Sequence, residues 1–210
     1  LAGIFTLEDG IKVIAKRAEL MTSLPSGMML SVAASSDTVE AHLAEFGLDI
    51  AAVNGSASVV VAGTEIEILK YKQFLDSQNI AGIALKTSHA FHSRMMLPIV
   101  SEFEKFLDTI PKLAPRVSML STVSLERDGS ELQTSKYWAE HILKTVFFAP
   151  AIQQLISQQE ITLLEVGPRN VLSNLARKES LLKGKKDIKI ISLLSDKLTL
   201  ENSAVMEAIG

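Results

Sequence analysis

Two histidines lie close together in Ser88-His89-Ala90-Phe91-His92-Ser93, the segment of this chain with the clearest potential for chemistry. The segment follows a predicted strand and precedes a predicted helix. Strand–helix junctions at the C-terminal ends of parallel strands are where α/β folds place their sites. An imidazole at such a junction can act as a general base near neutral pH. The first hypothesis is therefore proton transfer by one of these two side chains.

Two other interpretations of His89 and His92 stay open at this point. Both imidazoles could instead satisfy backbone groups at a turn, and the spacing alone favours neither alternative. A zinc site is the weaker hypothesis, because the chain has no Cys and no pair of carboxylates near these histidines in the sequence. The lack of Cys also excludes disulfides, thiolate metal sites and a cysteine nucleophile.

The residues before these histidines predict a β-α-β-β-α-β unit. Its strands are expected at 28–34, 50–53, 58–62 and 83–87, and its helices at 36–46 and 64–78. Ser36 or Asp37 is the expected cap of the first helix, and Gly47 is its expected stop. Asn54-Gly55 is the strongest hairpin signal in the chain. Residues 28–87 are therefore expected to form a small ferredoxin-like lobe.

Residues 1–27 and 88–210 are expected to form a larger α/β lobe that carries the small one. Its helices are predicted at 6–24, 94–108, 136–144, 149–158 and after Asn170, and its strands at 117–121, 162–166 and 188–193. Thr6 and Asp9 form an acidic variant of the capping box, and Asn170 is placed to cap the last helix. Strands that alternate with helices indicate a parallel sheet.

Composition excludes several classes of protein. The chain has 210 residues, of which 47% are hydrophobic, and its formal net charge is −3. The hydrophobic fraction is enough for a core, which excludes general disorder, and the charge gives no positive field for nucleic acid. The longest apolar runs are much shorter than a membrane span, and Leu1 does not open a signal peptide. We expect a cytoplasmic enzyme domain cut from a longer chain.

Thr87–Met96 resembles the histidine motif of polyketide synthase acyltransferase domains and of malonyl-CoA:acyl carrier protein transacylases. Leu1–Met21 resembles the helix that follows the nucleophile in that family, and Ala51–Val61 resembles the hairpin of its small lobe. Tyr137–His141 and Leu164–Arg177 resemble two late motifs, in the family's order. The resemblance implies an α/β-hydrolase-like parallel-sheet lobe, present only in part, with a ferredoxin-like βαββαβ small lobe.

The resemblance also implies a ping-pong acyltransferase. In the family, a serine attacks the thioester of malonyl-CoA, and the acyl-enzyme passes the malonyl group to the phosphopantetheine thiol of an acyl carrier protein. His92 matches the general base that activates the serine, and a backbone carbonyl in residues 146–148 is expected to fix its tautomer. No cofactor of the protein's own is implied, because the carrier protein brings the phosphopantetheine. Adjoining synthase domains, such as a ketosynthase, are expected as further partners.

Arg17, His89 and Phe91 are the substrate-binding residues that the same resemblance implies. Arg17 matches an arginine that holds the free carboxylate of a malonyl group, a task that suits a guanidinium fork. Its position alone predicts only an exposed helix residue. Phe91 belongs to the form of the motif that accepts malonyl rather than methylmalonyl, a discrimination of about 1–3 kcal/mol for one methyl group. His141 is expected to be structural.

One departure from the family concerns the nucleophile. No Gly-x-Ser-x-Gly pentapeptide, the family's serine elbow, occurs between Leu1 and Gly210. We therefore expect these residues alone to be inactive, with the serine supplied from upstream. Arg94 is a smaller departure, since proline is common there in the family. The alternative hypothesis is a catalytically silent piece that docks a carrier protein or serves as a scaffold between lobes.

Overall fold

The computed structural model describes residues 2–127, 129–157, 161–167, 169–184 and 188–194. Contacts between residues divide the chain into two compact units, Leu1–Phe147 and Phe148–Gly210, and each is described by itself. Among the described residues, no helix has both the length and the apolar character needed to cross a membrane.

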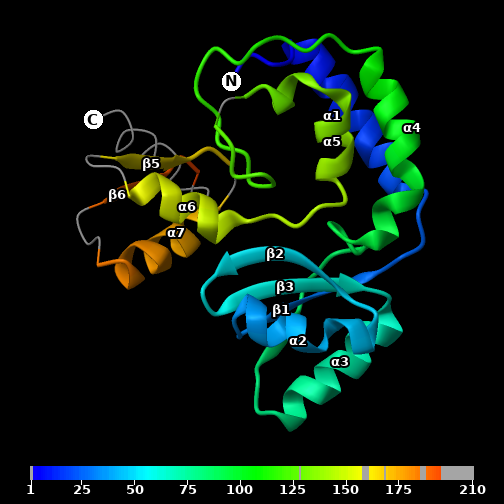
Figure 1. Ribbon diagram of the computed structural model, residues 1–210, viewed down its shortest axis with the longest axis vertical. Coiled ribbons are helices and arrows are strands. Elements are labelled where there is room, and N and C mark those ends of the chain that lie inside the picture. Colours follow the sequence, from blue (N-terminus) through cyan, green and yellow to red (C-terminus); the bar gives the residue numbers. More distant parts are fainter. Residues whose placement is uncertain (1, 128, 158–160, 168, 185–187, 195–210) are drawn as a thin grey trace. The chain divides into compact units, whose positions relative to one another are not determined.

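The first unit contains a four-stranded antiparallel sheet in the order β2-β3-β1-β4 (Figure 1). The strands are β1 (Met28–Val32), β2 (Asp49–Gly55), β3 (Ser58–Gly63) and β4 (Gly82–Ala84), and the helices between them are α2 (Ser36–Phe46) and α3 (Glu65–Ser77). The β-α-β-β-α-β order predicted from the sequence is confirmed, and it is the order of the ferredoxin-like fold. The boundaries of a separate lobe at 28 and 87 stay a prediction.

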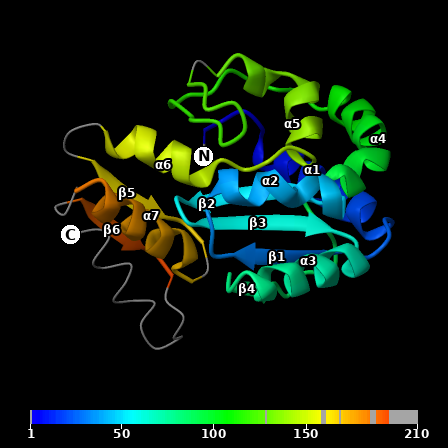
Figure 2. The same ribbon diagram turned by 60° about the horizontal axis from the view of Figure 1, so that its bottom comes forward.

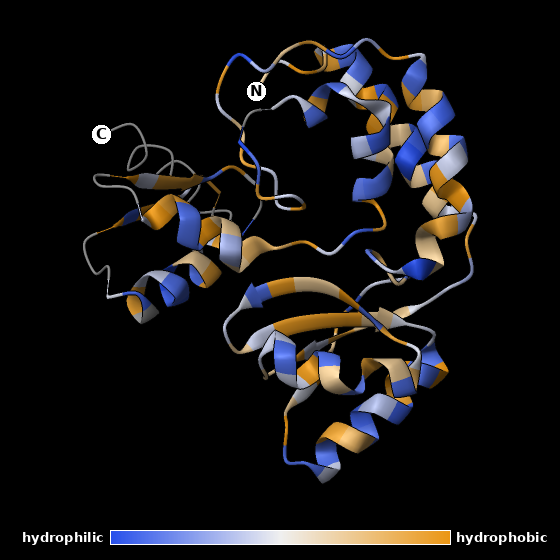
Figure 3. Ribbon diagram, viewed as in Figure 1, coloured by the Kyte–Doolittle hydropathy of each residue, from blue (hydrophilic) through white to orange (hydrophobic). Residues whose placement is uncertain are grey.

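The two faces of this sheet bury different partners. One face packs α2 and α3 over alternating residues of β1 and β3, including Leu30, Val32 and Val61. The opposite face contacts Ala90 and a partly buried Phe91. Successive side chains of a strand point to opposite faces of the sheet. Since both faces are covered, neighbouring residues of β3 are both buried, and the strand is hydrophobic along most of its length (Figure 3). The turn that carries the two histidines is thus anchored on the sheet.

Two local predictions in the sheet region need correction. Ser35 caps α2, because its hydroxyl accepts the backbone N–H of Thr38 at 3.2 Å, so neither Ser36 nor Asp37 is the cap. The hairpin between β2 and β3 exists, but Gly55 pairs with Ser58, which places the turn after Asn54-Gly55. The register of β2 against β3 is irregular at two places, between Ile50 and Ala52 and between Val53 and Gly55. The stop at Gly47 is confirmed, in the left-handed conformation with φ 70°.

Three helices pack together in the rest of the first unit: α1 (Leu7–Thr22), α4 (Leu97–Asp108) and α5 (Ser135–His141) (Figure 1). Two short 3-10 helices, η1 (Arg94–Met96) and η2 (Glu131–Gln133), precede α4 and α5. Their shared core holds buried residues of all three helices, among them Leu20, Phe103 and Ala139. Thr6 caps α1 as predicted, with Asp9 N–H donating to its hydroxyl at 3.1 Å.

The strand predicted at 117–121 is wrong. These residues form irregular structure with a turn after them. The hydroxyl of Ser121 accepts the N–H groups of Val123 and Ser124, both at 3.1 Å, and its carbonyl accepts the N–H of Leu125 at 3.1 Å. A serine side chain that bonds the following backbone favours a turn over a strand.

The second unit contains α6 (Phe148–Ile156), β5 (Thr162–Glu165), α7 (Val171–Leu182) and β6 (Lys189–Ser192) (Figure 2). Strands β5 and β6 pair in parallel, with Thr162 opposite Lys189, which confirms the predicted parallel pairing for these strands. Asp128-Gly129 and Gly167-Pro168 are dipeptides that predict turns, and each includes a residue outside the described ranges.

The predicted cap of α7 is wrong. Asn170 makes no side-chain capping bond, whereas the carboxylate of Glu165 accepts the N–H of Leu172 at 3.1 Å and that of Ser173 at 2.9 Å. A carboxylate at a helix N-terminus satisfies orphan donors and complements the helix dipole. Asn170 instead accepts a bond from the side chain of Asn174 at 3.2 Å.

Candidate active site

The turn before α4 holds His92 in an uncommon backbone conformation. Its φ is 56°, in the left-handed region that few residues other than glycine adopt. Ser93 follows it fully buried, donates its hydroxyl to the Ala90 carbonyl at 2.6 Å and accepts the N–H of Met95 at 3.2 Å. Gly27 lets this turn come close, since a Cβ there would lie 2.7 Å from the Ala90 Cβ. Packing and hydrogen bonds together hold the histidine in place.

The imidazole of His92 is oriented by a backbone carbonyl. Its Nδ1 lies 3.0 Å from the carbonyl oxygen of Lys144, and its backbone N–H donates to the carbonyl of Ile142 at 3.2 Å. A carbonyl can only accept, so Nδ1 carries the proton and Nε2 keeps the lone pair. The acceptor expected in residues 146–148 is therefore corrected to Lys144. This tautomer leaves Nε2 able to take a proton.

The pKa of His92 is lowered from its ordinary value. Burial is the main cause, the hydrogen bond to the Lys144 carbonyl opposes it, and the charge of Arg17 lowers the pKa further. The imidazole is therefore neutral at physiological pH, which is the form that a general base needs.

Arg17, on α1, is a half-buried cation without a carboxylate partner among the described residues. Its Nε is buried and has no hydrogen-bond partner there, and burial lowers the pKa of the guanidinium. The preceding residue behaves differently, because Lys16 pairs with Glu19 at 3.1 Å and with Glu102 at 3.2 Å. A buried guanidinium stays charged, and leaving it unpaired is costly, so this position favours an anionic ligand.

His141 has the helix-end position expected of a structural residue, but the sequence did not predict its place beside His92. It ends α5, and its ring lies 5.8 Å from the His92 ring, edge to face, and 5.9 Å from Tyr137. Burial lowers its pKa to about 4, and the nearby His92 and Arg17 contribute to the shift. His141 is therefore neutral and forms part of the wall around the candidate base. Its place beside two other titratable groups is set by tertiary packing and leaves no signal in the local sequence.

The remaining two predicted site residues lie in the same turn as His92. His89 has both ring nitrogens engaged, with Nδ1 2.8 Å from the Ser88 hydroxyl and Nε2 3.2 Å from the Leu24 carbonyl. His89 thus joins the turn to Leu24, which lies just after the end of α1. Phe91 is half-buried, and its ring lies 6.0 Å from that of His89. Arg17 is close enough to His92 for its charge to lower the pKa of the imidazole, and His89 joins Ser88 to Leu24.

A groove of about 470 Å³ opens nearby in the first unit. It is lined by residues 2–7, by part of α1, and by Met119 and Trp138, and it includes none of the four predicted site residues. Trp138 connects it to the site, because its ring lies 6.4 Å from that of His141. Among the described residues, no group of three or more metal-ligating side chains occurs, so the zinc hypothesis gains no support.

A family profile described as "Acyl transferase domain" matches residues 1–204. The chain belongs to this acyl transferase family. The family predicted from the histidine motif is thereby confirmed, and the candidate residues Arg17 and His92 both lie within the matched region.

Curated relatives of this chain include polyketide synthases. Polyketide synthase GfsA of Streptomyces halstedii is 35% identical over 181 residues, which cover 84% of the chain and 2% of that protein. The phenolphthiocerol synthesis polyketide synthase Pks15/1 of Mycobacterium marinum is 33% identical over 82% of the chain and 8% of its own length. The chain thus spans less than a tenth of either of these relatives.

Solved structures agree with the family. The acyltransferase domain from the second module of the salinomycin polyketide synthase has a TM-score of 0.91 and 34% identity, over 99% of the chain and 49% of that domain. The acyl transferase domain of SpnD, solved in complex with 2-(pent-4-yn-1-yl)malonyl, has a TM-score of 0.89 and 27% identity, over 99% of the chain and 50% of that one. The described fold is therefore that of acyltransferase domains, and the chain spans about half of them.

Proposed function

We propose that this acyltransferase transfers a malonyl extender unit from malonyl-CoA to the phosphopantetheine thiol of an acyl carrier protein, as part of a polyketide synthase. The observation that carries the proposal is a neutral, carbonyl-oriented imidazole, His92, beside Arg17, a half-buried cation that no described carboxylate neutralises. The first group suits proton transfer and the second suits a substrate with a free carboxylate.

In the proposed reaction, His92 acts as general base and general acid in turn. Its Nε2 takes the proton of a serine hydroxyl supplied by the part of the domain outside these residues, and the alkoxide attacks the thioester carbonyl. The carbon–sulfur bond breaks, and the imidazolium returns the proton to the leaving thiolate of coenzyme A. In the second half, Nε2 takes the proton of the carrier thiol, and the resulting thiolate attacks the ester. The carbon–oxygen bond breaks, and the imidazolium returns the proton to the serine oxygen. The Lys144 carbonyl keeps the ring oriented in both halves.

Arg17 and Phe91 are proposed to choose the acyl group. The guanidinium would pair with the carboxylate of the malonyl unit, which neutralises a charge that the protein leaves unpaired. The Phe91 ring would meet the extra methyl group of methylmalonyl, a difference of about 1–3 kcal/mol in favour of malonyl. His89 would hold the turn that carries Phe91 in place through its contact with the Leu24 carbonyl.

The test is a comparison of acyl groups in the full-length protein that contains these residues. Arg17→Ala should lower kcat/KM for malonyl-CoA by about 10–100-fold and narrow its advantage over acetyl-CoA, because a charge-assisted pair is worth about 1.5–3 kcal/mol. Lys16→Ala, one residue away on the same helix, is the matched control and should keep the selectivity of the wild type.

Three outcomes would contradict the proposal. Unchanged selectivity for malonyl in Arg17→Ala would remove Arg17 from the acyl site. A stable malonyl adduct on a serine of the 210-residue chain itself, detected by intact-protein mass spectrometry, would place the nucleophile here rather than outside. A full-length protein that transfers no acyl group, yet binds a carrier protein, would favour the scaffold hypothesis.

A further inference from the structure

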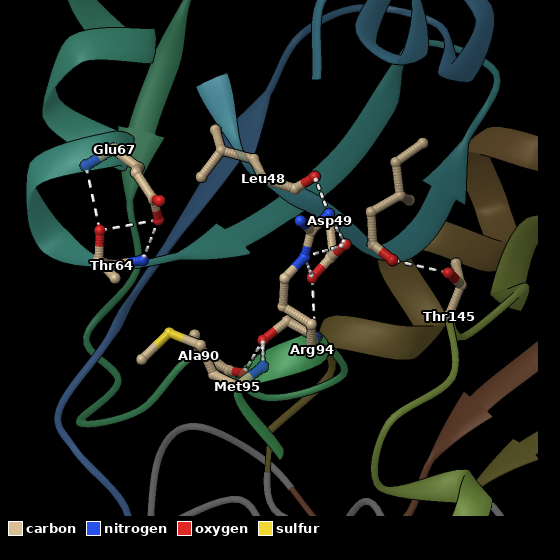
Figure 4. Close-up of polar contacts among 10 residues, drawn as sticks. Leu48, Asp49, Thr64, Glu67, Ala90, Arg94, Met95 and Thr145 are labelled. Carbon is tan, nitrogen blue, oxygen red and sulfur yellow. Dashed lines mark hydrogen bonds and ion pairs between the residues drawn. The ribbon is translucent and has the colours of Figure 1, made fainter. Parts of the chain in front are cut away.

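An ion pair joins the first strand residue of β2 to the turn that holds His92 (Figure 4). Asp49 accepts the backbone N–H of Arg94 at 2.7 Å, its Nε at 3.0 Å and its Nη2 at 2.7 Å. Arg94 follows His92 by two positions in the sequence. We propose that Asp49 and Arg94 are positioning residues that keep the His92 imidazole aligned with its orienting carbonyl. The inference rests on the proposed role of His92 as the base.

The orienting carbonyl is fastened to the same strand. The Thr145 hydroxyl donates to the Ile50 carbonyl at 2.6 Å, next to the Lys144 carbonyl that accepts the His92 bond (Figure 4). The N–H of Val146 then donates to the Ala51 carbonyl at 2.9 Å, and Val53 N–H donates to the Val146 carbonyl at 2.9 Å. Strand β2 therefore holds both ends of the hydrogen bond that sets the imidazole's tautomer and direction.

The conformation of His92 shows why such a hold matters. A left-handed φ of 56° is unfavourable for a residue with a Cβ, and it persists where the surroundings enforce it. Behind His92, the buried Ser93 bonds to Ala90 within the turn itself. Ahead of it, the Asp49 carboxylate takes the N–H of Arg94 and fixes the turn to the sheet. A proline at position 94 would have no N–H to offer this carboxylate.

The pair is better suited to geometry than to stability. The Arg94 side chain is 62% exposed, and exposed ion pairs contribute little to the free energy of folding. Its contacts are nevertheless directional, because the guanidinium engages both oxygens of one carboxylate while the backbone binds the same group. Loss of the pair should therefore change the placement of His92 more than the stability of the protein.

Kinetics of the full-length protein test the proposal. Asp49→Ala removes the backbone and side-chain bonds together, and it should lower kcat about 10-fold with less than a twofold change in KM for malonyl-CoA, since misplacement by about 1 Å can cost up to 10²-fold. Arg94→Ala keeps the backbone N–H and should lower kcat less, about threefold, and Arg94→Lys should recover part of that loss. Asp76→Ala breaks another exposed ion pair, with Lys72 on α3, and should leave kcat unchanged.

Nuclear magnetic resonance of ¹⁵N-labelled histidines in the 210-residue chain separates this proposal from the role of His92. The wild type should show the Nδ1–H tautomer at His92, and Asp49→Ala should show a mixture with the Nε2–H form. Unchanged kcat in both variants, or a rise in KM alone, would overturn the proposal. If Asp49→Ala does not fold, Arg94→Ala decides by the same criteria. If His92→Ala keeps full activity, the proposed function fails, while the tautomer shift still tests the positioning.

Discussion

Two junctions of this chain place a residue with a Cβ in the left-handed conformation just before a helix. One is His92, with φ 56°, in the first unit, and the other is Arg169, with φ 69°, in the second. At the second junction the polar groups satisfy one another, because Glu165 caps α7 and Ser192 donates to the Arg169 carbonyl at 2.8 Å. At the first, the imidazole has Nδ1 engaged and lies near the unpaired Arg17. Similar backbone geometry thus occurs at a junction whose polar groups satisfy one another and at a junction for which we propose a role in proton transfer.

The strongest test of this difference is His92→Ala in the full-length protein. Removal of a general base should lower kcat/KM for malonyl transfer by about 10²–10⁴-fold. The free energy of unfolding should change little, because the ring is only half-buried. The measurement is the rate of malonyl transfer from malonyl-CoA to a carrier protein, followed by mass spectrometry.

His42→Ala is the matched control for that experiment. His42 lies on α2 and packs its ring against Phe74 at 4.8 Å, in the same unit but away from the candidate base. It should transfer malonyl at the wild-type rate. A rate in His92→Ala within threefold of the wild type would show that the two junctions do not differ in chemistry, and would end the assignment of the base.

The free energy of unfolding should also depend on pH below neutrality, and this effect is smaller than the loss of activity in His92→Ala. The folded-state pKa of His141 is about 4, below the ordinary value of 6.5. Between pH 4 and pH 6.5 the unfolded chain therefore binds a proton at His141 that the native chain does not bind. Stability therefore rises with pH between about 4 and 6.5, by up to about 1.4 kcal/mol per pH unit for one group. We expect a loss of about 3 kcal/mol from His141 as the pH falls through this window.

Urea unfolding of wild type and His141→Asn at pH 7 and pH 5 checks the sign. The wild type should lose more stability on acidification than the variant, because asparagine has no proton to bind. His92 acts in the same direction through its own lowered pKa, and Tyr137 titrates only at high pH, so the variant should keep part of the slope. Equal slopes in the two proteins would contradict a buried, neutral His141.

Much of this fold follows from local signals in the sequence. The cap at Thr6, the stop at Gly47 and the hydrophobic strands predict much of the sheet and helices of the first unit, and the structure has them. These signals act between neighbours in the chain, so a sequence displays them directly. The turn with two histidines was found in the same way, from its position between a strand and a helix.

The rest depends on contacts between distant segments. His141 comes next to His92 only because α5 packs on α4, and the unpaired state of Arg17 depends on which carboxylates come near it. The hydrophobic residues at 117–121 wrongly predicted a strand, because among the described residues this segment belongs to neither sheet. Asn170 had the right residue type for a cap, yet Glu165 reaches the helix from a strand. Sequence spacing carries no information on such encounters.

Glu165→Ala should give the smallest effect and the clearest view of the second junction. The variant leaves the N–H groups of Leu172 and Ser173 without their carboxylate, at a cost of about 1 kcal/mol, as for other lost helix caps. Lys178→Ala, at an exposed position of the same helix, is the control and should change stability by less than half of that. Thermal unfolding measures both. If Glu165→Ala lowered the rate of malonyl transfer as much as His92→Ala does, the second junction would also take part in the chemistry, and the contrast between the two would have to be withdrawn.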